Sequence, residues 1–363
     1  MAREGRGWPR PVPTGGASGA RSDGPGKAAA SVEQAVLLVG GLGTRLRPLT
    51  DILPKAMIPV ANLPLIAYEI VPLVRAGVRR IIFAMGYKAD LLRRGLGDGR
   101  EWGAEFVYVE EPEPLDTAGA IGNVRQHVDG PFFVCNGDII YDVDLAAFAG
   151  EHVERGALVS FCLRQTKHIE YFGLIQYEDS GRVSAFCEKA HHDETGRNTV
   201  NSGFYVMAPE VFDHIPVGSA YSSERQLFPK LLAAGLPLFA HLPENQGYWA
   251  DVGRLDTYLQ ASGDVLEGAL GWYRPRFGGR IASGATVAPS VSVDAGARVD
   301  CGARLGERVA VGADSVVEKG ACIANSIIWP GSRVGQGARL TDTVVAGTVV
   351  PAGHEATNEV IVG

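Results

Sequence analysis

The sequence lacks the features that mark secreted, membrane-spanning and nucleic-acid-binding proteins. Its five cysteines are odd in number and form no CxxC pair, which argues against a disulfide framework and a zinc site. No apolar stretch reaches the roughly 18 residues of a membrane-spanning helix. The net charge of −7 does not suit a surface for nucleic acid, which basic patches bind. We therefore expect a cytoplasmic protein with reduced thiols and neither membrane nor nucleic acid as a partner.

The first 30 residues also have little from which to build a core. They hold eleven Gly or Pro and five Lys or Arg, and they contain no apolar stretch of the kind found in signal peptides. We expect residues 1–30 to be a disordered leader. The rest of the chain, with 46% hydrophobic residues over the full length of 363, is long enough for two cores.

Between Val36 and Gly271, short apolar runs alternate with helical patterns. This order predicts an α/β domain over residues 31–271 with a doubly wound, mixed and mainly parallel sheet. Ligands of such sheets bind beyond the carboxyl ends of the strands. The expected strands are 81–85, 105–109, 132–135, 158–163 and 203–207, and the expected helices are 65–75 and 224–232.

The end of the chain follows a period of six, after a linker predicted at 272–280. The period resembles the hexapeptide repeat of left-handed parallel β-helices, in which three hexads make one coil. We expect this fold over residues 281–363, with a corner adjustment after Ile323, where the next step is five residues. The repeating positions are Ile281, Val287, Val293, Val299, Leu305, Val311, Val317 and Ile323, continued by Ile328, Val334 and Leu340.

Glycines and positive charge follow the first apolar run, Val36–Val39. Backbone without Cβ atoms can bring N–H groups against phosphate oxygens, and Arg45 and Lys55 add positive charge. No lysine follows the glycines as in a Walker loop, and Leu46 stands where a dinucleotide fingerprint has its third glycine. The stretch is therefore a different kind of anion site.

The strings GGLGTRLRPLT and PKAMIPV resemble the signature of sugar-1-phosphate nucleotidyltransferases. These enzymes join a nucleoside triphosphate to a sugar 1-phosphate and release pyrophosphate. The resemblance implies both molecules as substrates, with Arg45 and Lys55 holding the triphosphate and the developing pyrophosphate. The implied nucleotide-binding residues of the loop are Gly40, Gly41, Gly43 and Thr44.

Two aspartates stand in contexts that resemble the metal-binding segments of this family. Asp138 ends the string CNGD after an apolar run, and Asp251 lies in WADVG. Taken alone, either would more often be a turn or cap residue. The resemblance implies that both bind Mg²⁺, which prefers oxygen ligands and shares its shell with substrate phosphates.

Two further segments, FCEK and VNSGFY, resemble the acceptor-binding segments of the family. Lys189 is implied to bind the sugar phosphate and Glu188 the ring hydroxyls. Ala190 stands where the family usually has proline, so this loop departs from the pattern. The remaining implied pocket residues are Asn201 or Ser202 and Gly173.

Base recognition is assigned to the stretch EEPEPLDTAGA, residues 110–120. The family has a segment ending in G-T-A-G or G-L-A at this point, and T-A-G is associated with guanylyl and related purine transfer. The resemblance therefore implies that Thr117 and Ala118 lie at the nucleotide. Asp116 replaces a glycine that is usual in the family. Glu111 can accept hydrogen bonds from the N1 and N2 donors of guanine. A solvated acidic turn fits the same residues.

The leading interpretation is a guanylyltransferase that acts on mannose 1-phosphate. Thymidylyl, uridylyl or adenylyl transfer to glucose 1-phosphate, and guanylyl transfer to a carbasugar phosphate, stay open. A non-catalytic regulatory subunit would show gaps at the arginine, lysine or aspartates, and none is seen. Acyl transfer on the β-helix would need a histidine between coils, where only His354 is available. The flat faces and open coil ends predict a homo-oligomer.

Overall fold

A computed structural model describes residues 32–363 except 168, 188–192 and 194. The predicted leader, residues 1–30, lies outside this range. The described chain divides into two compact units. One comprises Leu42–Ala67 and Ala250–Gly363, and the other comprises residues 32–41 and Tyr68–Trp249. None of the helices in the described part of the chain is long and apolar enough to cross a membrane. The domain limits at 271 and 281 stay predictions.

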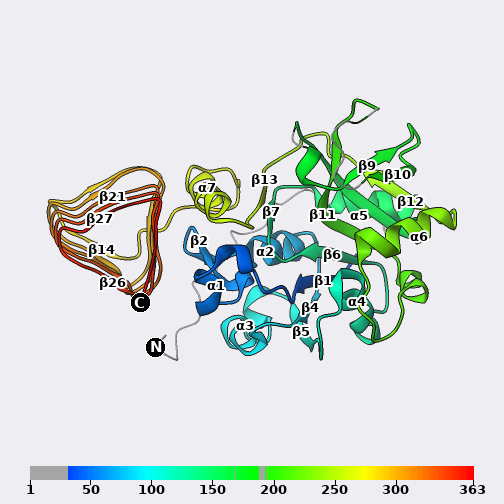
Figure 1. Cartoon of the computed structure of the whole chain (residues 1–363), viewed down its shortest axis with the longest axis horizontal. Helices are drawn as coiled ribbons and strands as arrows, with labels where there is room; N and C mark the ends of the chain where they lie inside the picture. The colour runs from blue at the N-terminus through cyan, green and yellow to red at the C-terminus, as the bar shows by residue number, and fades with distance from the viewer. Residues whose placement is uncertain (1–31, 168, 188–192, 194) are drawn as a thin grey trace, which may run out of the picture. The chain divides into compact units, whose positions relative to one another are not determined.

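The unit that contains Tyr68–Trp249 is built on a nine-stranded mixed sheet (Figure 1). Its parallel half has the order β6-β1-β4-β5, and β11 joins β6 in antiparallel orientation. The mixed α/β sheet predicted from the sequence is confirmed. The strands are β1 (Gln34–Val39), β4 (Arg80–Met85), β5 (Glu105–Glu110), β6 (Phe132–Asn136), β8 (Val159–Gln165), β9 (Leu174–Tyr177), β10 (Val183–Cys187), β11 (Thr199–Met207) and β12 (Leu238–His241).

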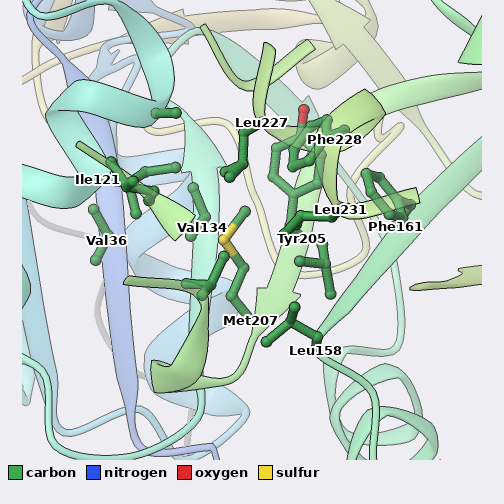
Figure 2. Packing of buried hydrophobic residues seen from close by; sticks show 14 of the residues in the cluster. Val36, Ile121, Val134, Leu158, Phe161, Tyr205, Met207, Leu227, Phe228 and Leu231 are labelled. Carbon is green, nitrogen blue, oxygen red and sulfur yellow. The ribbon is translucent and has the colours of Figure 1, made fainter. Parts of the chain in front are cut away.

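Helices cover both faces of this sheet. Neighbouring residues of β11 point to opposite faces, so each packs against a different helix. The ring of Tyr205 packs 5.3 Å from that of Phe228 on one face, and the ring of Phe204 lies 5.7 Å from that of Phe148 on the other. Figure 2 shows the first of these layers, in which Val36, Val134 and Tyr205 meet Ile121, Phe228 and Leu231. The helices are α2 (Ala67–Arg75), α3 (Ala89–Leu96), α4 (Asp116–Asn123), α5 (Leu145–Glu154) and α6 (Phe228–Ala233), with a π-helical turn, η7 (Ser223–Leu227), before α6.

The C-terminal repeats form three sheets of five parallel strands each, consistent with a left-handed β-helix (Figure 1). Ile281 pairs with Val299 and Val299 with Val317, so one coil takes three hexads. The sheets are β14 (Arg280–Ile281), β17 (Arg298–Val299), β20 (Val316–Val317), β23 (Arg333–Val334) and β26 (Val349–Val350); β15 (Thr286–Val287), β18 (Arg304–Leu305), β21 (Cys322–Ala324), β24 (Arg339–Thr341) and β27 (Glu355–Thr357); and β16 (Val291–Val293), β19 (Val309–Val311), β22 (Ile327–Ile328), β25 (Val344–Ala346) and β28 (Val360–Val362).

The predicted phase slip after Ile323 is a tightened corner. Asn325 and Asp342 stand at this corner in successive coils, both with positive φ, and Asn325 Nδ2 donates a hydrogen bond to Asp342 Oδ1. Asparagine and aspartate tolerate this left-handed conformation better than most residues, so they can shorten a corner by one residue. Val317 still pairs with Val334, which keeps the apolar ladder in register.

The β-helix is bonded to the hairpin of β2 (Pro59–Val60) and β3 (Leu63–Pro64), which lies in the same unit. Asn62, buried at the hairpin turn with φ 68°, donates from Nδ2 to the Val311 carbonyl at 3.0 Å and to Ser292 Oγ at 3.2 Å. Helix α7 (Leu255–Leu266) adds Tyr258, whose hydroxyl donates to the Pro59 carbonyl at 2.6 Å. These contacts fix the hairpin that follows Lys55.

Replacing Asn62 with glycine tests this attachment. Glycine keeps the positive φ but removes the hydrogen bonds to Ser292 Oγ and to the Val311 carbonyl, which still accepts from the Asp294 amide at 2.9 Å. The loss of two buried hydrogen bonds should lower the free energy of unfolding by about 1–3 kcal/mol. Asn358→Gly is the matched control, because Asn358 is exposed on the β-helix with φ 56°. Urea denaturation measures both variants. Equal losses of stability would show that the hairpin contact contributes nothing.

Candidate active site

The carboxyl ends of β1, β4 and β5 bring backbone and a carboxylate into close contact. A Cβ atom on Gly40 would lie only 2.9 Å from Oε1 of Glu111, and a Cβ on Gly86 would lie 3.0 Å from the Gly40 carbonyl oxygen. Only glycine fits both positions without a shift of its neighbours. The glycine backbone after β1 therefore packs directly beside the Glu111 carboxylate.

Glu111 is held by the loop that follows it. Its Oε2 accepts a hydrogen bond from the Leu115 amide at 3.0 Å, and its own amide donates to the Met85 carbonyl at 2.7 Å. Burial raises the pKa of Glu111, and the Leu115 hydrogen bond lowers it in part. A half-buried carboxylate fixed through one oxygen can accept hydrogen bonds from a ligand at the other.

Asp138 lies where the next parallel strand, β6, ends. It is half-buried between β6 and β7 (Ile139–Tyr141), and its amide donates to the Asn136 carbonyl at 2.7 Å. The preceding Gly137 amide donates to the Leu38 carbonyl of β1 at 3.0 Å. The predicted position of Asp138 at a strand end therefore agrees with the structure.

In the other unit, Gly43 of the glycine loop is followed by the positively charged residues Arg45 and Lys55. Gly43 has φ 60°, and a Cβ there would meet Thr50 Cγ2 at 2.9 Å and Lys55 Cβ at 3.2 Å. The Thr50 hydroxyl donates to the Gly43 carbonyl at 3.0 Å and fixes the turn. Thr44 follows directly and begins a 3₁₀ turn with Arg45 (η1, Thr44–Leu46). Gly41 has no atom within 4 Å of an added Cβ, so in this loop only Gly40 and Gly43 are sterically required to be glycine.

The same unit brings together Arg45 and Asp251. A Cβ on Gly253 would lie 2.9 Å from Arg45 Nη2 and also 2.9 Å from Asp251 Oδ1, which is shielded from solvent. A guanidinium beside a carboxylate suits a site for phosphate and a cation together, because each charge attracts the opposite one in the ligand. The predicted residues Arg45 and Asp251 are thus neighbours, and Gly253 is what leaves them room.

The oxygen donors fit Mg²⁺, which binds one or two carboxylates and takes the rest of its shell from phosphates and water. No group of three or more His, Cys, Asp or Glu that could hold a metal occurs in the described part of the chain.

The predicted acceptor residues separate into two places. Gly173 and Asn201 line one pocket, where the backbone amide of Asn201 donates a hydrogen bond to the Gly173 carbonyl at 2.9 Å. Ser202 points to the other face of β11, donates to the Cys162 carbonyl at 2.7 Å and lines a second pocket. Of the predicted pair, Asn201 is the residue that lies with Gly173. Glu188 and Lys189, with Ala190, lie outside the described residues.

The pocket of Gly173 and Asn201 also contains Glu224, which the sequence analysis placed only in a helix. Glu224 lies on the π-helical turn η7, whose wider spacing has no signature in the sequence. The rings of Phe186 and Phe228 form apolar parts of the same wall.

The loop assigned to base recognition is tied to this turn. Thr117 Oγ1 donates to Glu224 Oε2 at 3.1 Å and accepts from the Ser223 amide at 2.8 Å. Asp116 takes up positive φ (57°) in place of the usual glycine and pairs with Arg225 Nη2 at 2.6 Å. The Ala118 side chain is buried in the core, so any contact of Ala118 with a nucleotide would fall to its backbone.

Comparison with known proteins identifies the family of this chain. A family model described as "Nucleotidyl transferase" matches residues 34–268. The mannose-1-phosphate guanylyltransferase of Mycobacterium tuberculosis is 35% identical over 313 residues, which cover 86% of this chain and 79% of that protein. The UTP–glucose-1-phosphate uridylyltransferase of Synechocystis is 29% identical over 340 residues, covering 86% of this chain and 87% of that protein.

A solved structure of HddC from Yersinia pseudotuberculosis complexed with GMP-PN has 25% sequence identity and a TM-score of 0.55, and the match covers 64% of this chain and 100% of that one. Because the family match spans more than half of the chain, this protein belongs to the nucleotidyl transferase family and is a sugar-1-phosphate nucleotidyltransferase.

Proposed function

We propose that the protein transfers a guanylyl group from GTP to mannose 1-phosphate. The observation that carries the choice of base is Glu111, held by Leu115 with its Oε1 directed toward Gly40. Guanine presents two donors, N1–H and the N2 amino group, to such a carboxylate, whereas thymine and uracil present only N3–H. The similarity of this chain to the guanylyltransferase of M. tuberculosis and to HddC, which was solved in complex with GMP-PN, supports the same base.

In the reaction, a phosphate oxygen of the acceptor attacks the α-phosphorus of GTP. A new P–O bond forms, the bond to the β-phosphate oxygen breaks, and pyrophosphate leaves. Arg45 and Lys55 offset the negative charge of the triphosphate and of the leaving pyrophosphate, so catalysis consists mainly of alignment and electrostatic stabilisation. Asp138 and Asp251 would hold Mg²⁺, which neutralises phosphate charge when bound. Lys189 and Glu188 are proposed to bind the acceptor's phosphate and ring hydroxyls.

Two other functions follow from particular features. Uridylyl transfer to glucose 1-phosphate is supported by the Synechocystis relative, and the departures at Asp116 and Ala190 leave room for a carbasugar phosphate as acceptor. A purely regulatory role is disfavoured because Arg45, Lys55 and both aspartates are present.

Pyrophosphate release, measured with GTP, dTTP, UTP and ATP against several sugar 1-phosphates, tests the proposed function. GTP with mannose 1-phosphate should give the highest kcat/KM. A wild-type preference for dTTP or UTP would refute the guanylyl assignment.

Replacing Asp138 or Asp251 with asparagine should lower kcat by about 100-fold or more, because each change removes a charge from a mainly ionic metal site. Asp213→Asn, an exposed aspartate elsewhere, is the matched control and should be neutral. Pyrophosphate release at saturating Mg²⁺ gives the rates, and circular dichroism checks the fold. Near-normal turnover in both variants would end the metal proposal.

Glu111→Gln should narrow the preference for GTP over dTTP by about tenfold or more, since a hydrogen bond to a charged group contributes about 1.5–3 kcal/mol. A neutral amide offers one acceptor and a misplaced donor to guanine. Glu113→Gln, an exposed carboxylate two residues on, should leave the preference unchanged. The comparison is the ratio of kcat/KM for the two triphosphates. An unaltered ratio in Glu111→Gln removes this residue from base selection.

We also propose that the β-helix assembles subunits. Apolar side chains are exposed near its two ends: Phe277 (56%) and Ile281 (37%) at the first coil, and Val349 (63%) and Val362 (38%) at the last. Light scattering should show an oligomer, and Val349→Glu should weaken it, whereas Val217→Glu should not, although this valine of the other unit is even more exposed (77%). A full-length protein that is monomeric at micromolar concentration would exclude this role.

A further inference from the structure

Glu224 lies where the pocket of Gly173 and Asn201 meets the loop of Thr117. Its side chain lines the pocket of Gly173 and Asn201, and its Oε2 accepts the hydrogen bond of Thr117. The π-helical turn that carries it widens the helix by one residue, a feature that often marks functional positions. Asn201 is the other polar side chain that lines this pocket, and its Nδ2 donates to the Tyr205 hydroxyl while its Oδ1 accepts from the Gly203 amide. Leu174, Ile175, Phe186 and Phe228 line much of the rest, and such apolar groups suit the C–H face of a sugar ring.

A chain of hydrogen bonds runs through this carboxylate. The Ser222 hydroxyl donates to Oε2 at 3.4 Å, and the Tyr205 hydroxyl donates to Oε1 at 3.5 Å. Asn201 Nδ2 in turn donates to the Tyr205 hydroxyl at 2.6 Å. Figure 2 shows the Tyr205 ring packed beside Phe228, with its hydroxyl oxygen pointing away from the apolar cluster. The apolar core therefore holds the Tyr205 hydroxyl in place, and this hydroxyl in turn orients Glu224.

The carboxylate retains capacity for another donor. An ionised carboxylate has about four lone-pair positions. Thr117, Ser222 and Tyr205 address three of them, two at distances of 3.4 Å or more. The neighbouring Arg225 is directed elsewhere, since its Nη2 pairs with Asp116 at 2.6 Å and its Nε donates to Ser222 Oγ at 3.3 Å.

We propose that Glu224 determines acceptor specificity by accepting a hydrogen bond from one hydroxyl of the sugar 1-phosphate. This rests on the proposed function, because it requires a sugar phosphate in the pocket of Gly173 and Asn201. A carboxylate only accepts, so it selects a hydroxyl, which can donate, over hydrogen or fluorine at the same ring carbon. Thr117 donates a hydrogen bond to the same carboxylate, so the acceptor hydroxyl would bind next to the loop assigned to the nucleotide.

The test compares wild type and Glu224→Gln on the best acceptor and on its 2-, 3-, 4- and 6-deoxy analogues. Wild type should lose about tenfold or more in kcat/KM at the deoxy position that Glu224 reads. Glu224→Gln should lose a similar factor on the parent acceptor and almost nothing further at that position, because the two changes remove the same hydrogen bond. The KM for GTP at saturating acceptor should change less.

Glu210→Gln, an exposed glutamate of the same unit, is the matched control and should match wild type on every acceptor. Tyr205→Phe is a second variant that keeps Glu224 but removes one of its donors, and it should preserve the sensitivity to the deoxy position. The proposal is overturned if, at all four positions, the loss of kcat/KM caused by Glu224→Gln and the loss caused by the missing hydroxyl are independent, so that the variant loses the product of the two factors. If wild type forms no nucleotide sugar with any acceptor, the proposed function itself has failed.

Discussion

Phosphate groups can be held by backbone only where no side chain stands in the way, and this steric requirement governs the regions described above. Added Cβ atoms would collide with Glu111 at Gly40, with Thr50 at Gly43, and with Arg45 and Asp251 at Gly253. At Gly40 and Gly253 the glycine lets the backbone approach a charged group closely, and at Gly43 it leaves room for the methyl group of Thr50. The charges that could bind a triphosphate and a metal are therefore set by the tight packing of the loops around them.

Carboxylates in this protein have different surroundings, which suit them to different ligands. Asp251 lies beside the Arg45 guanidinium, whereas Glu111 is half-buried and has a raised pKa. Glu224 accepts hydrogen bonds only from neutral hydroxyl groups in the contacts described. A carboxylate next to a cation suits a metal and phosphates, and one surrounded by hydroxyls suits a neutral sugar. The same functional group can thus serve three substrate parts.

The β-helix is more than an appended repeat, because it shares buried hydrogen bonds with the hairpin that follows Lys55. Asn62 reaches the Val311 carbonyl, and Trp329 Nε1 donates to the Tyr258 hydroxyl at 3.0 Å. Removing the coils would expose these polar groups and the apolar surface around them. A chain ending near Arg276 would therefore lose support for the Lys55 segment as well as the repeats.

The sequence by itself determined the features that depend on local pattern. The apolar run before Gly40 predicted a strand and its glycine turn, and the period of six predicted the coils, because each hexad must place one apolar residue inside. Only the tertiary structure decided which of Asn201 and Ser202 faces the pocket of Gly173, since that depends on the direction of each side chain of β11. It also decided that Glu224 meets Thr117. These residues are 107 positions apart, and contacts over such distances follow from packing of the whole sheet, which no local spacing encodes.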